Sequence, residues 1–208
     1  MKLSEYKVIF WDFDGVIKDS LEIKTESFKN LFKKESLEFI ERVGRHHIYN
    51  GGVPRYEKIP LYLSWLNKNT DKNVEKYLIR FKNMTVQKVI ESDWVEGVEN
   101  FINQNSISQN YYIVTGTPQD EIKIILEELN LIKNFKGYFG SPSKKEDIIS
   151  HILSEKKYNP SECIMIGDAT ADYDAAKANK INFLLRKHKD NQDIFINYQG
   201  LQVTNFLA

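Results

Sequence analysis

The chain reads Tyr-Lys-Val-Ile-Phe-Trp-Asp-Phe-Asp-Gly-Val-Ile from residue 6 to residue 17. The apolar run predicts a buried strand, and Gly15 lets the chain turn sharply after it. Asp12 and Asp14 therefore stand at a strand end, where paired carboxylates can hold a hard cation, attack an electrophile or move a proton. A calcium loop counted from Asp12 is excluded, because its sixth and twelfth positions would be Ile17 and Ile23. An ordinary polar turn stays open at this point.

The composition describes an ordinary globular chain of 208 residues, with 41% hydrophobic and 28% charged residues. Lys plus Arg and Asp plus Glu both number 29, so no excess positive charge favours a nucleic acid as partner. No apolar run approaches the roughly 18 residues that span a membrane. The single cysteine, Cys163, permits no internal disulfide, which predicts a cytoplasmic setting. It lies in an apolar run and is interpreted as core packing, not as a nucleophile.

Four further apolar runs end in turn or polar residues, and helical stripes separate them. The runs are residues 111–114, 137–139, 163–166 and 182–185. The helical stretches are residues 120–131, 146–155 and 172–179. Continuous apolar runs suit strands that are covered on both faces, and alternation with helices predicts a parallel sheet. Reactive groups in such a sheet gather beyond the carboxyl ends of the strands.

Residues 19–92 show apolar side chains at helical spacing, about four helices and no clear strand. This segment is predicted to be a helical insert between the first and second core strands. The core unit would then comprise residues 1–18 and 93–208.

Polar clusters follow the predicted strands. Thr115 and Gly116 could hold a phosphate or an oxyanion with a hydroxyl and a backbone N–H group, although Thr-Gly turns are common. Lys144 or Lys145 could place an ammonium near an anionic nucleophile. Asp168 would be a third carboxylate for a cation at Asp12 and Asp14. Asp172, four positions on, is by itself typical of a helix N-terminus.

Together these motifs, in this order and each at a strand end, resemble the haloacid dehalogenase-like hydrolase superfamily, in particular its phosphoglycolate phosphatase and β-phosphoglucomutase-like members. The resemblance covers nearly the whole chain. It implies a three-layer Rossmann-like core with a parallel sheet, and a small helical cap domain at the place of the helical insert. The chain departs from the usual motifs in two places: no proline follows either lysine, and Asn179-Lys180 stands where Ala-Gly is common.

The resemblance also implies roles for the site residues. Asp12 would attack phosphorus and become an aspartyl-phosphate, and Asp14 would act as acid and then as base. Mg²⁺ would be held by Asp12, the backbone carbonyl of Asp14 and Asp168. The phosphoryl oxygens would be held by Thr115 and the amide of Gly116.

The lysine of the site is predicted to be Lys144, because this choice leaves Ile148 and Ile152 in the register usual for such helices. Asp172 would orient that lysine or a metal-bound water. Arg55, in a loop that resembles the cap loop of β-phosphoglucomutase-like members, would bind a remote phosphate of the substrate. The alternative that this loop only links two helices and faces solvent stays open.

The resulting hypothesis is a Mg²⁺-dependent phosphatase that acts on a small phosphorylated metabolite, as a monomer or weak homodimer. An acid at position 14 disfavours carbon–halogen hydrolysis. Two alternatives stay open: a sugar phosphomutase that uses Arg55 for a second phosphate, and a receiver-like phospho-acceptor module. The sequence does not identify the substrate.

Overall fold

A computed structural model describes residues 3–207; residues 1–2 and 208 of the predicted core unit lie outside this range. Six parallel strands form one sheet in the order β3-β2-β1-β4-β5-β6. In chain order they are β1 (Val8–Trp11), β2 (Asn110–Pro118), β3 (Gly137–Ser141), β4 (Cys163–Gly167), β5 (Asn182–Arg186) and β6 (Leu201–Val203). Strand β1 lies between β2 and β4, so the acidic pair that follows it stands near the middle of the sheet edge.

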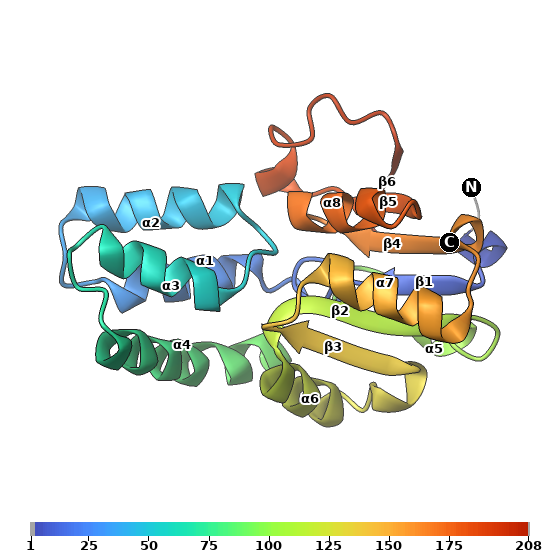
Figure 1. Cartoon of the computed structure of the whole chain (residues 1–208), viewed down its shortest axis with the longest axis horizontal. Helices are drawn as coiled ribbons and strands as arrows, with labels where there is room; N and C mark the ends of the chain where they lie inside the picture. The colour runs from blue at the N-terminus through green and yellow to red at the C-terminus, as the bar shows by residue number, and fades with distance from the viewer. Residues whose placement is uncertain (1–2, 208) are drawn as a thin grey trace.

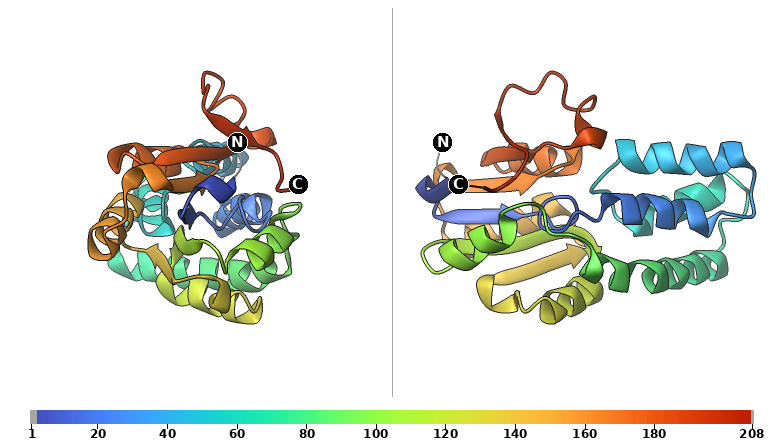
Figure 2. Two further views of the ribbon diagram at one scale, coloured as in Figure 1. Left: turned by 90° about the vertical axis from the view of Figure 1, so that its right-hand side faces the viewer. Right: turned by 180° about the vertical axis from the view of Figure 1, so that it is seen from behind.

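Helices cover both faces of the sheet (Figures 1 and 2). Ile9 and Trp11 of β1 face α5 (Val98–Asn105) and α6 (Gln119–Glu128) in one apolar core. Val8 and Phe10 face the opposite way, into a core that includes apolar side chains of α7 (Lys145–Lys156) and α8 (Thr170–Ala178). The predicted three-layer α/β fold is confirmed.

The sequence missed two elements of this core, α5 and β6. Strand β6 has only three residues, and none of them is fully buried, so its apolar signal is weak. Short 3-10 turns complete the chain at Leu3–Glu5, Ile132–Asn134, Pro160–Glu162 and Lys189–Asn191. No helix within residues 3–207 combines the length and the apolar character that crossing a lipid bilayer requires.

Of the five helices between β1 and β2, the first four pack beyond the carboxyl ends of the strands (Figure 1). They are α1 (Leu21–Leu31), α2 (Leu37–Tyr49), α3 (Arg55–Ser64) and α4 (Asp71–Glu91). Their apolar faces meet in a separate core that includes Phe28, Val43, Tyr62 and Phe81. These four helices are called the helical insert below, and its boundaries at residues 19 and 92 stay a prediction.

The sheet core supplies a first test. Ile166 of β4 is fully buried, so Ile166→Ala should lower the free energy of unfolding by about 2–5 kcal/mol. Ile107 is 93% exposed, and Ile107→Ala should change the free energy of unfolding by less than about 0.5 kcal/mol. Urea denaturation of both variants measures the difference. Equal losses would show that the central strand does not carry the core as described.

Candidate active site

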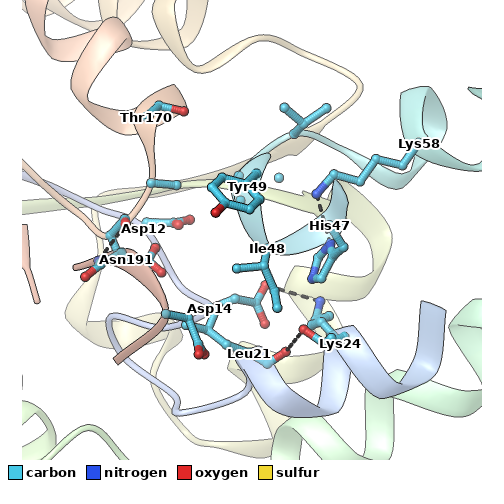
Figure 3. A pocket seen from close by; sticks show the side chains of 18 of the residues that line it. Asp12, Asp14, Leu21, Lys24, His47, Ile48, Tyr49, Lys58, Thr170 and Asn191 are labelled. Carbon is cyan, nitrogen blue, oxygen red and sulfur yellow. Dashed lines mark hydrogen bonds and ion pairs between the residues drawn. The ribbon is translucent and has the colours of Figure 1, made fainter. Parts of the chain in front are cut away.

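A cavity lies where the carboxyl ends of the strands face the helical insert (Figure 3). Its empty space is about 860 Å³, the open mouth included. The core side of the lining includes Asp12, Asp14, Thr115, Gly116 and Asp168, which the structure therefore brings together as the sequence predicted.

Asp12 is held at the end of β1 as an almost fully buried carboxylate. Its backbone N–H still donates to the Ile166 carbonyl at 2.9 Å, so strand pairing fixes its position. Carboxylate oxygens of Asp12, Asp168 and Asp172 lie within 4.8 Å of one another. Burial raises the pKa of Asp12 to about 7, and the negative charge of Asp172 adds to this rise.

Lys145 supplies the positive charge at this acidic cluster. Its Nζ lies 2.9 Å from Asp12 Oδ1 and 2.5 Å from Asp172 Oδ1. Burial opposes its charge, but the two carboxylates outweigh this effect and raise the pKa of Lys145. Asp172 is fully buried, and its other oxygen accepts a hydrogen bond from the Ala169 N–H at 3.1 Å. Asp172 therefore positions the ammonium against Asp12.

The lysine that contacts Asp12 in the structure is Lys145 and not Lys144, which the sequence analysis favoured as the site lysine. Lys144 is the exposed residue that precedes α7, while Lys145 is buried as its first residue. The buried stripe of α7 consists of Lys145, Ile148, Ile149 and Ile152. A spacing of three, four and seven residues puts Lys145 on this stripe, whereas Lys144 falls beside it.

Asp14 has surroundings unlike those of Asp12. Its Oδ1 accepts a hydrogen bond from Ser20 Oγ at 2.6 Å, and its Oδ2 accepts one from Thr117 Oγ1 at 2.7 Å. Lys24 Nζ lies 3.2 Å from Oδ2. Burial alone would raise the pKa of Asp14, but the Lys24 charge and these hydrogen bonds lower it below its usual value.

The Thr115–Thr117 segment forms the end of β2. Thr115 Oγ1 accepts a hydrogen bond from the Thr117 N–H at 3.2 Å, which fixes the local turn. Gly116 is required by a close approach, because a Cβ atom there would lie 2.7 Å from the Gly52 carbonyl oxygen of the helical insert. The two segments therefore meet backbone to backbone at the cavity.

Asp168 is held by the segment after β5, which the sequence did not point to. Its Oδ2 lies 3.0 Å from His188 Nε2, and its carbonyl accepts a hydrogen bond from Asn191 Nδ2 at 2.8 Å. Burial raises the pKa of Asp168, although the contact with His188 opposes the rise. Asp168 also lies against Gly15, where a Cβ would come within 2.5 Å of its Oδ2.

The donor set fits a hard divalent cation. Asp12 and Asp168 offer carboxylate oxygens, which Mg²⁺ prefers, and Asp12 Oδ1 is buried without a well-oriented hydrogen bond. Asp172 is the third member of the cluster, but Lys145 already uses one of its oxygens. The Asp14 side chain is engaged by Ser20, Thr117 and Lys24, so Asp14 would contribute through its backbone carbonyl.

Arg55 occupies the cavity wall but is already paired. Its Nη1 and Nη2 lie 3.0 and 2.8 Å from the two carboxylate oxygens of Glu121 in α6. Both side chains are only 4% exposed, and the guanidinium also lies over the Phe81 ring. This pair joins the helical insert to the sheet core, so the structure does not place Arg55 as a free phosphate ligand.

Two buried lysines of the helical insert line the cavity and escaped the sequence prediction. Lys24 falls on the buried stripe of α1 with Ser27, Phe28 and Leu31. Lys58 falls on the buried stripe of α3 with Ile59, Tyr62 and Leu63. Each lysine stands at a helical spacing where an apolar residue is expected, and that spacing was the signal available in the sequence.

Comparison with known proteins agrees with the family resemblance of the sequence motifs. The family model described as haloacid dehalogenase-like hydrolase matches residues 8–185. A phosphoglycolate phosphatase from Colwellia psychrerythraea is 24% identical over 223 residues, which cover 97% of this chain and 93% of that protein.

Solved structures share the fold. A β-phosphoglucomutase from Clostridium difficile has a TM-score of 0.73 at 19% identity, covering 97% of this chain and 92% of that one. A haloacid dehalogenase-like hydrolase from Streptococcus pneumoniae has a TM-score of 0.71 at 21% identity. The match covers 96% of this chain and 93% of that one. At these identities the likeness concerns the fold alone.

The Arg55–Glu121 pair predicts a stability difference. Arg55→Met should lower the free energy of unfolding by about 3–5 kcal/mol, because it leaves the Glu121 carboxylate buried and unpaired. Arg55→Met with Glu121→Met should cost less than the sum of the two single changes. Urea denaturation measures all three variants.

The matched control is Lys82, which pairs with Asp120 of the same helix α6 at an exposed position. Lys82→Met should cost about 0–1 kcal/mol. If Arg55→Met cost no more than Lys82→Met, the buried pair would not join the helical insert to the core.

Proposed function

Because the chain belongs to the haloacid dehalogenase-like hydrolase family, we propose that it is a Mg²⁺-dependent phosphatase that acts on a small phosphorylated metabolite through an aspartyl-phosphate. The family predicted from the motifs is confirmed, and with it the expectation of an enzyme. The reaction class and the roles of the residues are the proposal.

One observation carries it: the two carboxylates of the first motif have different surroundings that suit different tasks. Asp12 faces the cavity beside Lys145, with Asp168 next to it, which suits a nucleophile at a cation site. Asp14 is held by two hydroxyl groups and Lys24, which suits an acid and base that must keep one orientation.

The residues would act in two steps. The Asp12 carboxylate forms a bond to phosphorus as the bond to the leaving oxygen breaks, and Asp14 gives that oxygen a proton. Asp14 then takes a proton from water as the water attacks the aspartyl-phosphate and releases phosphate and free Asp12. Lys145, Thr115 and the Gly116 amide would stabilise the phosphoryl oxygens. The covalent intermediate divides one difficult displacement at phosphorus into two easier ones.

Asp12 and Asp168, with the carbonyl of Asp14, would hold the divalent cation, which supplies positive charge against the repulsion between carboxylate and phosphate. Burial, with the Asp172 charge, raises the pKa of Asp12, whereas the Lys24 charge and the Ser20 and Thr117 hydrogen bonds lower the pKa of Asp14 against its burial. Positive charge at Asp12 favours its ionised form. A phosphate dianion beside Asp14 raises the pKa of Asp14, so the bound substrate promotes the protonation that the first step needs.

The sequence based the phosphomutase alternative on Arg55 as the ligand of a second phosphate. The pairing of Arg55 with Glu121 removes that support, so hydrolysis is the preferred hypothesis. A receiver-like module does not agree with the family match over residues 8–185. We also propose that the active form is a monomer or weak homodimer.

The nucleophile assignment is tested with p-nitrophenyl phosphate. Asp12→Asn should abolish Mg²⁺-dependent hydrolysis, because an amide cannot form the acyl phosphate. Asp14→Asn should allow a phosphorylated Asp12 peptide to accumulate, which mass spectrometry detects. Asp71→Asn, an exposed carboxylate on α4, serves as the control and should keep full activity. Retained activity in Asp12→Asn would refute the proposal.

The metal assignment has its own measurement. Chelation with EDTA should remove activity, and added Mg²⁺ should restore it. Asp168→Asn should weaken Mg²⁺ binding in a calorimetric titration, because it removes one carboxylate of the donor set. Unchanged affinity in Asp168→Asn would contradict this set of ligands.

The two lysines can be separated by one pair of variants. Lys145→Met should lower kcat for p-nitrophenyl phosphate by about 10²- to 10³-fold, because it removes the cation that faces Asp12. Lys144→Met should behave like the unaltered enzyme, since that side chain is exposed. The opposite pattern would restore Lys144 as the site lysine.

A further inference from the structure

Lys58 of α3 is a buried cation that no carboxylate of residues 3–207 pairs with. Lys58 is only 1% exposed, and its Nζ lies 3.0 Å from His47 Nδ1. Among residues 3–207, no carboxylate oxygen lies within the 4.0 Å of an ion pair with Lys58. Burial of an unpaired ammonium is unfavourable, so a counter-charge is missing from the chain itself.

The other cations at this wall are already neutralised. Lys24 pairs with Asp14 across the cavity, and Arg55 pairs with Glu121. His47 contributes no charge, because burial and the nearby Lys58 and Lys24 charges hold its pKa well below the usual value. Lys58 therefore represents an excess positive charge on the insert side of the cavity.

The position of Lys58 connects it with the chemistry of the core. Lys58 and His47 line the same cavity as Asp12, Asp14 and Lys24. In Figure 3, Lys58 and His47 enter from the helical insert, while Asp12 lies on the opposite side. One small molecule can therefore reach Asp12 with its phosphate and Lys58 with its other end.

We propose that Lys58, assisted by His47 and Lys24, forms a subsite that binds a second anionic group of the phosphorylated substrate. This inference rests on the proposed phosphatase function and names its substrate class: short molecules with a phosphate at one end and a carboxylate or second phosphate at the other. The subsite takes the place of Arg55, which the sequence had assigned to a remote phosphate.

The contacts give each residue a task in the subsite. Lys58 supplies the charge that the ligand anion neutralises. With the ammonium protonated, His47 Nδ1 accepts its hydrogen bond and holds it in place. Lys24 adds positive potential from α1, while its own Nζ stays 3.1 Å from Thr117 Oγ1 and close to Asp14.

The main experiment compares three substrates that differ at the far end: 2-phosphoglycolate, fructose 1,6-bisphosphate and ethyl phosphate. At least one of the two charged substrates should have a higher kcat/KM than ethyl phosphate. Lys58→Met should lower kcat/KM for that substrate by about 10- to 100-fold and leave ethyl phosphate unchanged. The better of the two charged substrates identifies carboxylate or phosphate as the preferred group.

Lys76→Met, at an exposed position on α4, is the matched control and should change none of these values. A melting curve gives a readout that a merely structural lysine would not produce. Lys58→Met should raise the melting temperature, because it replaces a buried unpaired cation by an apolar side chain of similar length. A lower melting temperature with equal losses on all three substrates would overturn the subsite.

The pH dependence of selectivity offers an independent check. Burial, reinforced by Lys24, lowers the pKa of Lys58 to about 7, and Glu57 and Asp168 oppose this shift. His47 is neutral, and the facing Phe28 ring carries no charge. Below pH 7 the ammonium is present before the ligand binds; above it, binding must first take up a proton. The ratio of kcat/KM for the charged substrate to that for ethyl phosphate should therefore fall by up to about tenfold per pH unit above 7.

Lys58→Arg should show a flat ratio, because guanidinium stays protonated throughout this range. A ratio that fell equally in Lys58→Arg would contradict the role of Lys58.

A binding measurement separates failure of the subsite from failure of the phosphatase function. Calorimetry on the Asp12→Asn protein measures 2-phosphoglycolate and fructose 1,6-bisphosphate without turnover, and Lys58→Met in that background should weaken the tighter of the two. Phosphate release from p-nitrophenyl phosphate with no preference for charged ends would refute the subsite alone. Absence of phosphate release from every substrate would refute the phosphatase function.

Discussion

The burial of three carboxylates at one end of the sheet is the constraint on which the rest of the structure depends. Asp12, Asp168 and Asp172 repel one another at short range, and burial adds to the cost of their charges. Lys145 offsets part of this repulsion by contacting two of them. The first residue of α7, the end of β1 and the first turn of α8 must therefore lie at fixed positions relative to one another.

Charge also links the core with the helical insert. Lys24 of α1 reaches Asp14, and Arg55 of α3 reaches Glu121, so two buried ion pairs join the helical insert to the core. The close approach of Gly116 to Gly52 adds a backbone contact at the same place. In the proposed function, a substrate held between the units would exclude water from Asp12 and experience a stronger field from these charges than in bulk solvent. The helical insert thus shapes both access and electrostatics.

The sequence could predict the core because its signals are local. Runs such as residues 163–166 are apolar throughout, and Gly167-Asp168 follows directly, so the strand and its reactive end are predicted together. The lysine that contacts Asp12 lies one position beyond the predicted Lys144, because the register of Ile148 and Ile152 suits both lysines unless Ile149 is considered as well. The partner of Arg55 lies 66 residues away in a different unit, and only tertiary structure brings Glu121 to it.

Lys24, Lys58 and Lys145 share a property that local rules undervalue: each occupies the apolar stripe of its helix. Lysine is normally read as a surface residue, yet a lysine in this register has to be buried with the stripe. Burial requires a negative partner, so the register itself predicts that one exists. Lys145 finds Asp12 and Asp172, and Lys24 finds Asp14. Within residues 3–207, Lys58 finds a neutral histidine and no carboxylate, so the same argument assigns its partner to the ligand.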